Sequence, residues 1–379
     1  MDLQYDTEHG ILRDSAERFL AERYDYRTFQ KIADSEAGWS SDIWSEFAEL
    51  GWLALPFASD DGGIGGGPVE VSILMEAFGK SLVIEPYLAT VILGGGLVSA
   101  LGGPAERAQL LAPVIAGAAR LAFAHKDRSA PAIATKKGGG YALSGSKKVV
   151  LGAPMADTLL VSARLGAGLG VFIVPKGARG LTVRPYRTVD GARAADVDLL
   201  DVTVASPALL GGNEDAGQAI DHVIDRAIAA LSADAVGAVA TMLAATLEYT
   251  KTRVQFGQPI AKFQALQHRM VDMKVKEEEA RASCLFATLS LESPARLRAR
   301  AISGAKAKIG RNARSVAQNA IQLHGAIGTT RELPLGGYAR RLIAYETLFG
   351  TTREHLRRYG AMIADPAFVA DGLLTAAAN

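Results

Sequence analysis

The chain has 379 residues, of which 49% are hydrophobic and 21% charged, which is typical of a globular protein with two or three compact units. Lys and Arg total 41 and Asp and Glu total 40, so no basic excess points to nucleic acid. Cys284 is the only cysteine, which excludes an internal disulfide and a cysteine-rich metal site and favours a reducing cytoplasm; no metal site is expected.

The first third of the chain has helical periodicity. Thr7 is placed to cap the first helix, and Pro68 suits the first turn of a later one. The glycine stretch DDGGIGGGP before Pro68 predicts a backbone turn rather than a phosphate cradle, because no Lys-Ser/Thr follows it. The uncharged run 86–105 is broken by glycines, so a buried helix is favoured over a membrane span.

Between residues 120 and 210 the hydrophobic period changes from 3.6 to 2. Short runs rich in β-branched residues alternate with turn residues, and they read GYALSGSKKVVL, TLLVSARL, GVFIVP, GLTVRPY and ADVDLLDVTV. These runs predict a small β-barrel or sandwich.

The helical period then returns and continues to the end of the chain. Four long helices with apolar faces are expected over residues 215–253, 263–291, 294–324 and 333–363. The predicted fold is therefore α+β, with an N-terminal helical domain (1–117), a middle β-barrel or sandwich domain (118–213) and a C-terminal four-helix bundle (214–379).

Two stretches of the bundle, about sixty residues apart, carry a recognisable pattern. The first reads RVQFGQPIAKFQALQHRMVDM and the second QLHGAIGTTRELPLGGYARR. Together they resemble the acyl-CoA dehydrogenase family, to which ELGWLALPFASDDGGIGGG near the N-terminus is also similar, and the resemblance covers essentially the whole chain. The sequence as a whole is most similar to the small-subunit type of pimeloyl-CoA dehydrogenase, in the branch where two different chains assemble.

The resemblance implies a tetramer in which each FAD lies between subunits, with its ring on one chain's β-domain and its ADP end on the neighbour's bundle. Matched by position, the residues that meet the neighbour's FAD are Arg253, Phe256, Gln264, Gln322 and the turn at Gly325, with Thr351 counted among them. A guanidinium pairs with diphosphate oxygens, and glycines let backbone donors approach closely. Acyl-CoA is the implied substrate and an electron-transferring flavoprotein the implied acceptor.

The side that faces the flavin ring departs from the family pattern. Flavin-binding members carry a T-E-P-x-x-G-S-D-like segment there, and this chain has LAFAHKDRSAP, with His125 and Lys126 replacing the Thr-Glu pair. The family W-I-T-N becomes VVLG at residues 149–152, so the aromatic shelf and the threonine donor are missing. A buried flavin edge without donors costs about 1 to 3 kcal/mol per group, so the chain is not expected to hold its own ring.

The catalytic base also departs from the pattern. Removal of the α-proton of a thioester needs a carboxylate, which the family commonly places in Y-E-G-T, and that glutamate position is Phe349 here. Glu346 remains as the candidate base, one turn away from Phe349 if the helix continues, or it pairs with a nearby arginine. Other members place the base at the position of Ala227. Asp225 lies two residues away on another face and is expected to be a solvated partner of Arg226 or of a nearby lysine.

Three functions are compatible with these features of the sequence. The first is one half of a heterotetrameric, FAD-dependent acyl-CoA dehydrogenase that completes its partner's FAD site. The second is a self-sufficient homotetramer with Glu346 as base. The third is a catalytically silent scaffold or acyl-CoA-binding subunit, with non-dehydrogenating flavin chemistry as a related minority alternative.

Overall fold

The computed structural model describes residues 6–364, which fall into two compact units. Of the described residues, the helical unit takes 6–26, 68–83 and 228–364, and the β unit takes 27–67 and 84–227. In chain order, helices are followed by a β-domain and then by a helical domain, so the expected α+β architecture is confirmed. The domain boundaries expected at residues 117 and 213 stay a prediction.

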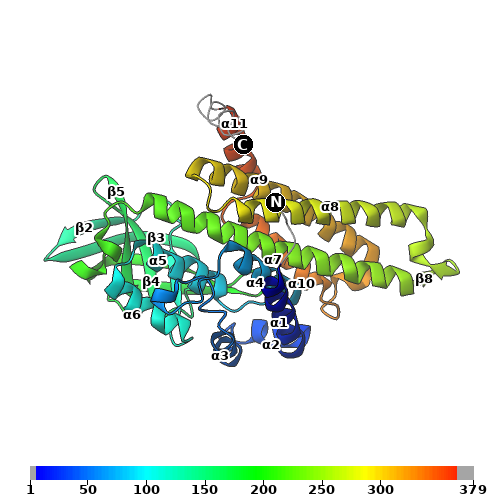
Figure 1. The fold of residues 1–379 in the computed structure, drawn as a ribbon, viewed down its shortest axis with the longest axis horizontal. Coiled ribbons are helices and arrows are strands. Elements are labelled where there is room, and N and C mark those ends of the chain that lie inside the picture. The colour runs from blue at the N-terminus through cyan, green and yellow to red at the C-terminus, as the bar shows by residue number, and fades with distance from the viewer. Residues whose placement is uncertain (1–5, 365–379) are drawn as a thin grey trace. The chain divides into compact units, whose positions relative to one another are not determined.

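The β unit contains a curled sheet that Figure 1 shows in green and cyan. Its strands are β1 (Leu121–Ala124), β2 (Ile133–Lys137), β3 (Gly140–Leu151), β4 (Thr158–Leu165), β5 (Gly168–Pro175), β6 (Leu181–Arg187) and β7 (Arg193–Ala205). The order is β1-β4-β2-β3-β7-β6, with β5 paired to β4. The five expected runs are all strands, and β1 and β2 add to them; β1 is buried at every position, so it shows no alternation.

Short helices complete the β unit. They are α2 (Tyr26–Asp34), α3 (Ser41–Glu49), η1 (Ser59–Asp61), the π-helical η2 (Leu88–Gly95), α5 (Gly96–Leu101), α6 (Pro104–Ile115), η3 (Ser206–Ala208) and η4 (Leu210–Gly212). The run expected as a buried helix is η2 with α5, and Gly94 and Gly95 allow close packing on Leu121 and Phe57. The glycine stretch before Pro68 is a turn. The N–H groups of Gly63, Gly65 and Gly66 donate to backbone carbonyls of the residues just before them and are therefore not available to a phosphate.

The helical unit is built around long helices. They are α1 (Thr7–Arg23), α4 (Pro68–Ser81), α7 (Gly217–Thr252), α8 (Gln264–Leu289), α9 (Ala295–His324), α10 (Leu335–Thr347) and α11 (Thr352–Ala364), with η5 (Ile260–Lys262) and η6 (Gly325–Thr329) between them. Asp6, rather than Thr7, caps α1 by accepting from the His9 N–H. Figure 1 shows the hairpin of β8 (Val254–Gln255) and β9 (Gln258–Pro259) at the tip where α7 is joined to α8.

The helix expected over residues 333–363 is two helices instead of one. α10 ends at Thr347, Leu348 is extended, and Phe349 and Gly350 have φ of 57° and 112°. Left-handed backbone cannot continue a right-handed helix, so the chain breaks there. Phe349 therefore lies in a loop, and the expectation that it continues the helix of Glu346 is wrong.

One helix of the described chain, α7, is long and apolar enough to cross a bilayer by length and composition. Most of its apolar stretch is buried inside the fold, which is the property of a core helix. The segment of α7 in the helical unit packs closely on α4: a Cβ on Gly79 or Gly237 would lie within about 2 Å of a backbone carbonyl oxygen of the facing helix.

Candidate cofactor and active site

The hairpin after α7 exposes its side chains. Phe256 and Gly257 form its two-residue turn, both with positive φ, as type I′ hairpin turns require. A positive φ is unfavourable for a bulky residue such as Phe256. The Phe256 side chain is in addition 91% exposed. Its ring meets the Phe263 ring edge to face, with centroids 6.1 Å apart. An exposed aromatic side chain in a disfavoured backbone conformation is a candidate for a contact with a ligand.

Arg253 lies at the base of this hairpin. Its backbone continues α7 through an N–H that the Tyr249 carbonyl accepts at 2.9 Å, while its own carbonyl accepts from Ile260 at 2.8 Å. The guanidinium is exposed, and no residue of the described chain forms an ion pair or hydrogen bond with it. Five N–H donors are therefore free to meet an anion.

The N-terminus of α8 follows the hairpin. Phe263 occupies the N-cap position and offers no side-chain acceptor, so the first N–H groups of α8 lack a side-chain cap. Gln264 is the first residue of the helix and is exposed. Open donors at a helix N-terminus favour a negatively charged group.

The C-terminus of α9 lies beside the end of α7. The Tyr249 hydroxyl donates to the His324 carbonyl at 3.3 Å, and the two rings stack with centroids 4.3 Å apart. Gln322 is exposed, and Gly325 has φ of 67° with no atom near the place of a Cβ. The structure thus brings the Gly325 turn and the Arg253 hairpin to the same end of the helical unit.

These bundle residues fit the ADP end of FAD. A partnerless guanidinium and an uncapped helix N-terminus suit a diphosphate, an exposed aromatic ring suits a flat base, and an open glycine turn lets backbone donors approach. The roles of Arg253, Phe256, Gln264, Gln322 and Gly325 in cofactor binding stay a prediction.

The carboxylate of Glu346, the candidate base, caps a helix. Its Oε1 accepts from the Thr352 N–H at 3.0 Å and its Oε2 from the Thr352 hydroxyl at 2.7 Å, while Arg314 Nη2 lies 3.8 Å away. The carboxylate thus sits at the N-terminus of α11, where the helix dipole stabilises negative charge.

Thr351, the remaining predicted cofactor residue, belongs to a second cap of the same helix. Its N–H and hydroxyl donate to Glu354 Oε2 at 2.7 and 2.9 Å, and its Oγ1 accepts from the Glu354 N–H at 3.3 Å. This is a capping box, and the sequence T-x-x-E at residues 351–354 could have predicted it.

Two buried titratable residues lie behind the loop, and no motif singled them out. His355 Nε2 donates to the Phe349 carbonyl at 3.0 Å, and burial lowers the pKa of His355. Lys306 Nζ donates to the Tyr345 carbonyl at 2.5 Å and lies 3.9 Å from the Tyr345 ring centroid. Burial lowers the pKa of Lys306 to about 8, against the opposing charge of Glu346.

Asp225 was expected to be solvated, and this is wrong. Its side chain is buried at 2% exposure on α7, and Ala227 is fully buried. α7 is apolar on most of its faces, so the face that carries Asp225 is covered as well.

Two positions of the β unit carry the predicted departure from the family pattern on the ring side, and their effect on flavin binding stays a prediction. Val149 and Leu151 stand in the aromatic and threonine positions, and Val149 is 40% exposed with φ of 54°. Its N–H is taken by Asp196 Oδ1 at 3.3 Å. The residues present therefore fit the isoalloxazine ring poorly at this edge.

Three family models match this chain, and together they span nearly all of it. They describe the N-terminal domain (residues 6–118), middle domain (126–202) and C-terminal domain (219–363) of acyl-CoA dehydrogenase.

Individual relatives match along almost their whole length. A probable acyl-CoA dehydrogenase, YngJ of Bacillus subtilis, is 29% identical over 350 residues, 88% of this chain and 91% of that protein. A chain of the Tcur3481-Tcur3483 steroid ACAD is 27% identical with a TM-score of 0.85, covering 97% of this chain and 99% of the other. A chain of the Mycobacterium tuberculosis ChsE4-ChsE5 complex, at 24% identity and a TM-score of 0.89, shares the fold over 96% of this chain and 99% of its own.

Proposed function

The chain belongs to the acyl-CoA dehydrogenase family, and on that premise we propose that it is the half of a heterotetramer that carries no catalytic base. The family relationship gives the reaction class, FAD-dependent dehydrogenation of an acyl-CoA, and the cofactor. The proposal adds that this chain completes the FAD site of a second, dehydrogenase-like chain, as in the small-subunit type of pimeloyl-CoA dehydrogenase.

The observation that carries the proposal is a contrast between two parts of one site. The hairpin of Arg253 and Phe256 presents free donors and an exposed ring, as a neighbour's cofactor needs. The base position is Phe349, which has no group that can accept a proton. A chain with the first feature and without the second is suited to assist catalysis in another chain.

The division of labour follows from the chemistry of the reaction. Bound FAD supplies the acceptor for the hydride that leaves the β-carbon. The α-proton must go to a carboxylate, and Glu346 is engaged by Thr352 at both of its oxygens. In the proposed complex the partner's carboxylate takes that proton, and Arg253 and the α8 N-terminus hold the diphosphate.

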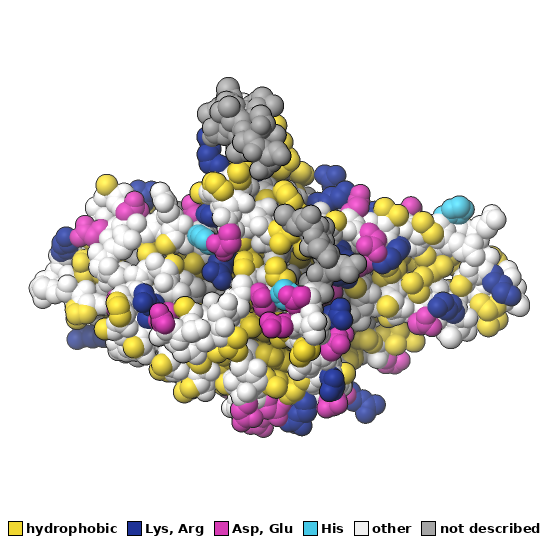
Figure 2. All heavy atoms as spheres, in the orientation of Figure 1, with side chains coloured by type: hydrophobic (Ala, Val, Ile, Leu, Met, Phe, Trp, Pro, Cys, Tyr) yellow, Lys and Arg dark blue, Asp and Glu magenta, His cyan; other side chains and the backbone are white. Residues whose placement is uncertain are grey.

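An apolar face on α8 supports assembly with other chains. Val271, Val275, Phe286 and Leu289 are each at least 44% exposed on this helix. Figure 2 shows apolar side chains among charged ones on the surface of the helical unit. The steroid ACAD that is 27% identical to this chain carries two protein names, Tcur3481 and Tcur3483, which supports a second chain as the occupant of this face. An electron-transferring flavoprotein remains our proposed acceptor, and the single buried thiol of Cys284 suits a reducing cytoplasm.

The first measurement is flavin per polypeptide, by absorbance, for the chain alone and for the chain co-expressed with its nearest dehydrogenase-like genomic neighbour. We expect no flavin on the chain alone and one flavin per two chains in a stable complex that acyl-CoA reduces anaerobically. About one flavin on the chain alone would overturn the proposal and favour the homotetramer with Glu346 as base. A flavin-loaded complex that no acyl-CoA reduces would favour the scaffold.

A further inference from the structure

A buried histidine holds the loop between α10 and α11, residues 348–351. His355 is 4% exposed, and its Nε2 lies 3.0 Å from the Phe349 carbonyl oxygen. Gly350 lies against the same edge of the ring, since a Cβ there would be 2.9 Å from Nε2 and 3.1 Å from Cδ2. Phe349 has left-handed backbone with φ of 57°, which is unfavourable for an aromatic residue. The contacts of His355 therefore hold the loop in a strained conformation.

This hydrogen bond assigns the proton of the imidazole ring. A carbonyl oxygen can only accept, so Nε2 carries the hydrogen, and Nδ1 of the neutral ring is an acceptor. Nδ1 is buried and has no hydrogen-bond partner in the described chain. Buried polar atoms without partners are rare, and this one leaves a place where a second proton can bind.

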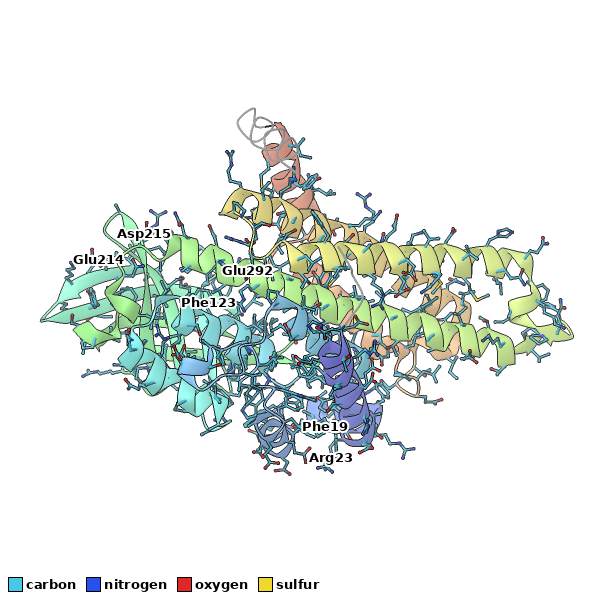
Figure 3. The ribbon with its side chains drawn as sticks, viewed as in Figure 1. Phe19, Arg23, Phe123, Glu214, Asp215 and Glu292 are labelled. Atoms are coloured by element: carbon cyan, nitrogen blue, oxygen red, sulfur yellow. The ribbon has the colours of Figure 1, made fainter. Side chains whose placement is uncertain are left out.

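The surroundings of the ring disfavour that second proton. α11 packs on α9 here, and Figure 3 shows the side chains of both helices. The charged groups around the ring are Lys306 from α9, whose charge Glu346 of α10 opposes, and Arg358 and Glu354 from α11. Burial lowers the pKa of His355, and the two cations lower it further, against the hydrogen bond to Phe349 and the Glu354 carboxylate. A proton on Nδ1 would add positive charge beside these cations and a buried N–H without an acceptor.

We propose that His355 is a pH-sensitive switch for the 348–351 loop, which the neutral ring holds through the Phe349 carbonyl and which protonation of Nδ1 releases. When the ring leaves its buried place, Nδ1 takes a proton from water, and the imidazolium stays in solvent because it has no acceptor inside. Phe349 then loses the hydrogen bond that opposes its backbone strain. Since the family pattern places its catalytic carboxylate at the position of Phe349, the switch controls the shape of the chain at that position. This inference concerns the chain alone and does not depend on the heteromeric arrangement proposed above.

The direction of the pH dependence follows from the two environments of the ring. In the opened loop the ring is in water, where a histidine has its ordinary pKa of about 6.5, and in the closed loop the pKa of His355 is lower. Between these two pH values only the opened form binds the second proton, so acid favours opening. The closed loop therefore has its full stability above about pH 6.5 and loses it as the pH falls through that value towards the pKa of the closed form.

Amide hydrogen exchange of the full chain tests the switch between pH 7.5 and 5.5. The reporter is the Thr351 N–H, which donates to Glu354 Oε2 at 2.7 Å in the closed loop. After correction for the intrinsic pH dependence of exchange, its protection should fall about five- to tenfold from pH 7.5 to 5.5. A glutamate in water titrates near pH 4.3, below this range, so the profile reports a histidine. Protection that does not change with pH would overturn the inference.

Two substitutions of histidine by glutamine separate His355 from other titrating groups. His355→Gln keeps an amide donor for the Phe349 carbonyl but cannot take a proton. Protection of the Thr351 N–H should then stay within about threefold of wild type at pH 7.5 and lose its pH dependence. His268→Gln makes the same change at an exposed histidine of α8 and should keep the wild-type pH dependence. An unchanged pH dependence in His355→Gln, or its loss in His268→Gln, would reject the assignment to His355.

NMR of the full chain labelled with ¹⁵N-histidine tests the proton assignment directly. The chain has six histidines, and the signal missing in His355→Gln identifies this one. We expect the neutral Nε2–H tautomer at pH 7.5, with protonation of Nδ1 following the loss of protection at Thr351. An Nδ1–H tautomer or an imidazolium at pH 7.5 would contradict the switch. If His355→Gln does not fold, the wild-type exchange profile still decides, because protection independent of pH already excludes the switch.

Discussion

Two stretches of the helical unit that the sequence placed in one site are built in opposite ways. The hairpin at residues 253–257 leaves the Arg253 guanidinium in solvent without a partner in the described chain, and it leaves the Phe256 ring exposed with an edge contact to Phe263. The loop at residues 346–352 uses its polar groups internally, through Glu346 with Thr352 and Thr351 with Glu354. Unsatisfied exposed groups point to a ligand or a second chain, while saturated ones hold the fold.

The largest expected effect is on the hairpin. Arg253→Ala in the co-expressed complex should weaken FAD binding roughly ten- to a hundredfold, because charge-assisted hydrogen bonds to the diphosphate are lost. The thermal midpoint of the flavin-free protein should not change, since the guanidinium has no partner in the described chain. Flavin content after dialysis and the apoprotein Tm are measured together.

Lys251→Ala is the matched control for Arg253. It removes a positive charge two residues away, from an exposed pair with Glu248 at 2.6 Å. Equal flavin loss in both variants would mean that general charge, and not the Arg253 guanidinium, attracts the cofactor.

A smaller effect is expected in the saturated loop. Glu346→Gln should lower the free energy of unfolding by about 1 to 2 kcal/mol, because a charged helix cap is removed. Anaerobic flavin reduction by acyl-CoA in the complex should stay within twofold. Thr352→Val removes the hydroxyl partner, and the two stability losses should not add fully in the double variant, because both substitutions remove the same hydrogen bond between the Thr352 hydroxyl and Glu346 Oε2.

A catalytic effect of Glu346→Gln would contradict the view that the loop at residues 346–352 serves only the fold. Abolished reduction with unchanged Tm and unchanged substrate binding would identify Glu346 as the base and support the homotetramer.

The smallest effect is a pH dependence behind the loop. Lys306 has a folded-state pKa of about 8, below its value in the unfolded chain. Between these two pH values Lys306 is protonated in the unfolded chain and neutral in the folded one. Its contribution to the free energy of unfolding therefore rises with pH in this range and is lost as pH falls toward 8. Between pH 7.5 and 9 wild type should gain about 1 kcal/mol relative to Lys306→Met, seen as a change in their Tm difference. Lys308→Met, which removes another lysine of α9 from its ion pair with Glu279, is the matched control for the loss of a lysine charge.

Several features could be predicted from the sequence because they are local. Hydrophobic residues that alternate with period 2 predicted the strands from β3 to β7, and hydrophobic residues spaced with period 3.6 predicted α7, α8 and α9. The family motifs and the phenylalanine at position 349 are likewise present in the linear chain. The capping box that starts α11 was also readable at residues 351–354, but the apolar spacing of residues 333–363 concealed the break before it.

The tertiary structure alone decided which polar groups are satisfied. The spacing of Glu346 is compatible with a base, but only the folded loop brings the Thr352 N–H and hydroxyl to its carboxylate. Asp225 has the pattern of a surface residue and is buried, because packing around α7 covers its face. His125 stands where the family pattern has a threonine, and only the fold brings Ser162 and Lys147 from two other strands into one hydrogen-bond network with it. Periodicity depends on neighbours in sequence, whereas solvation and hydrogen-bond partners depend on residues that only the fold brings together.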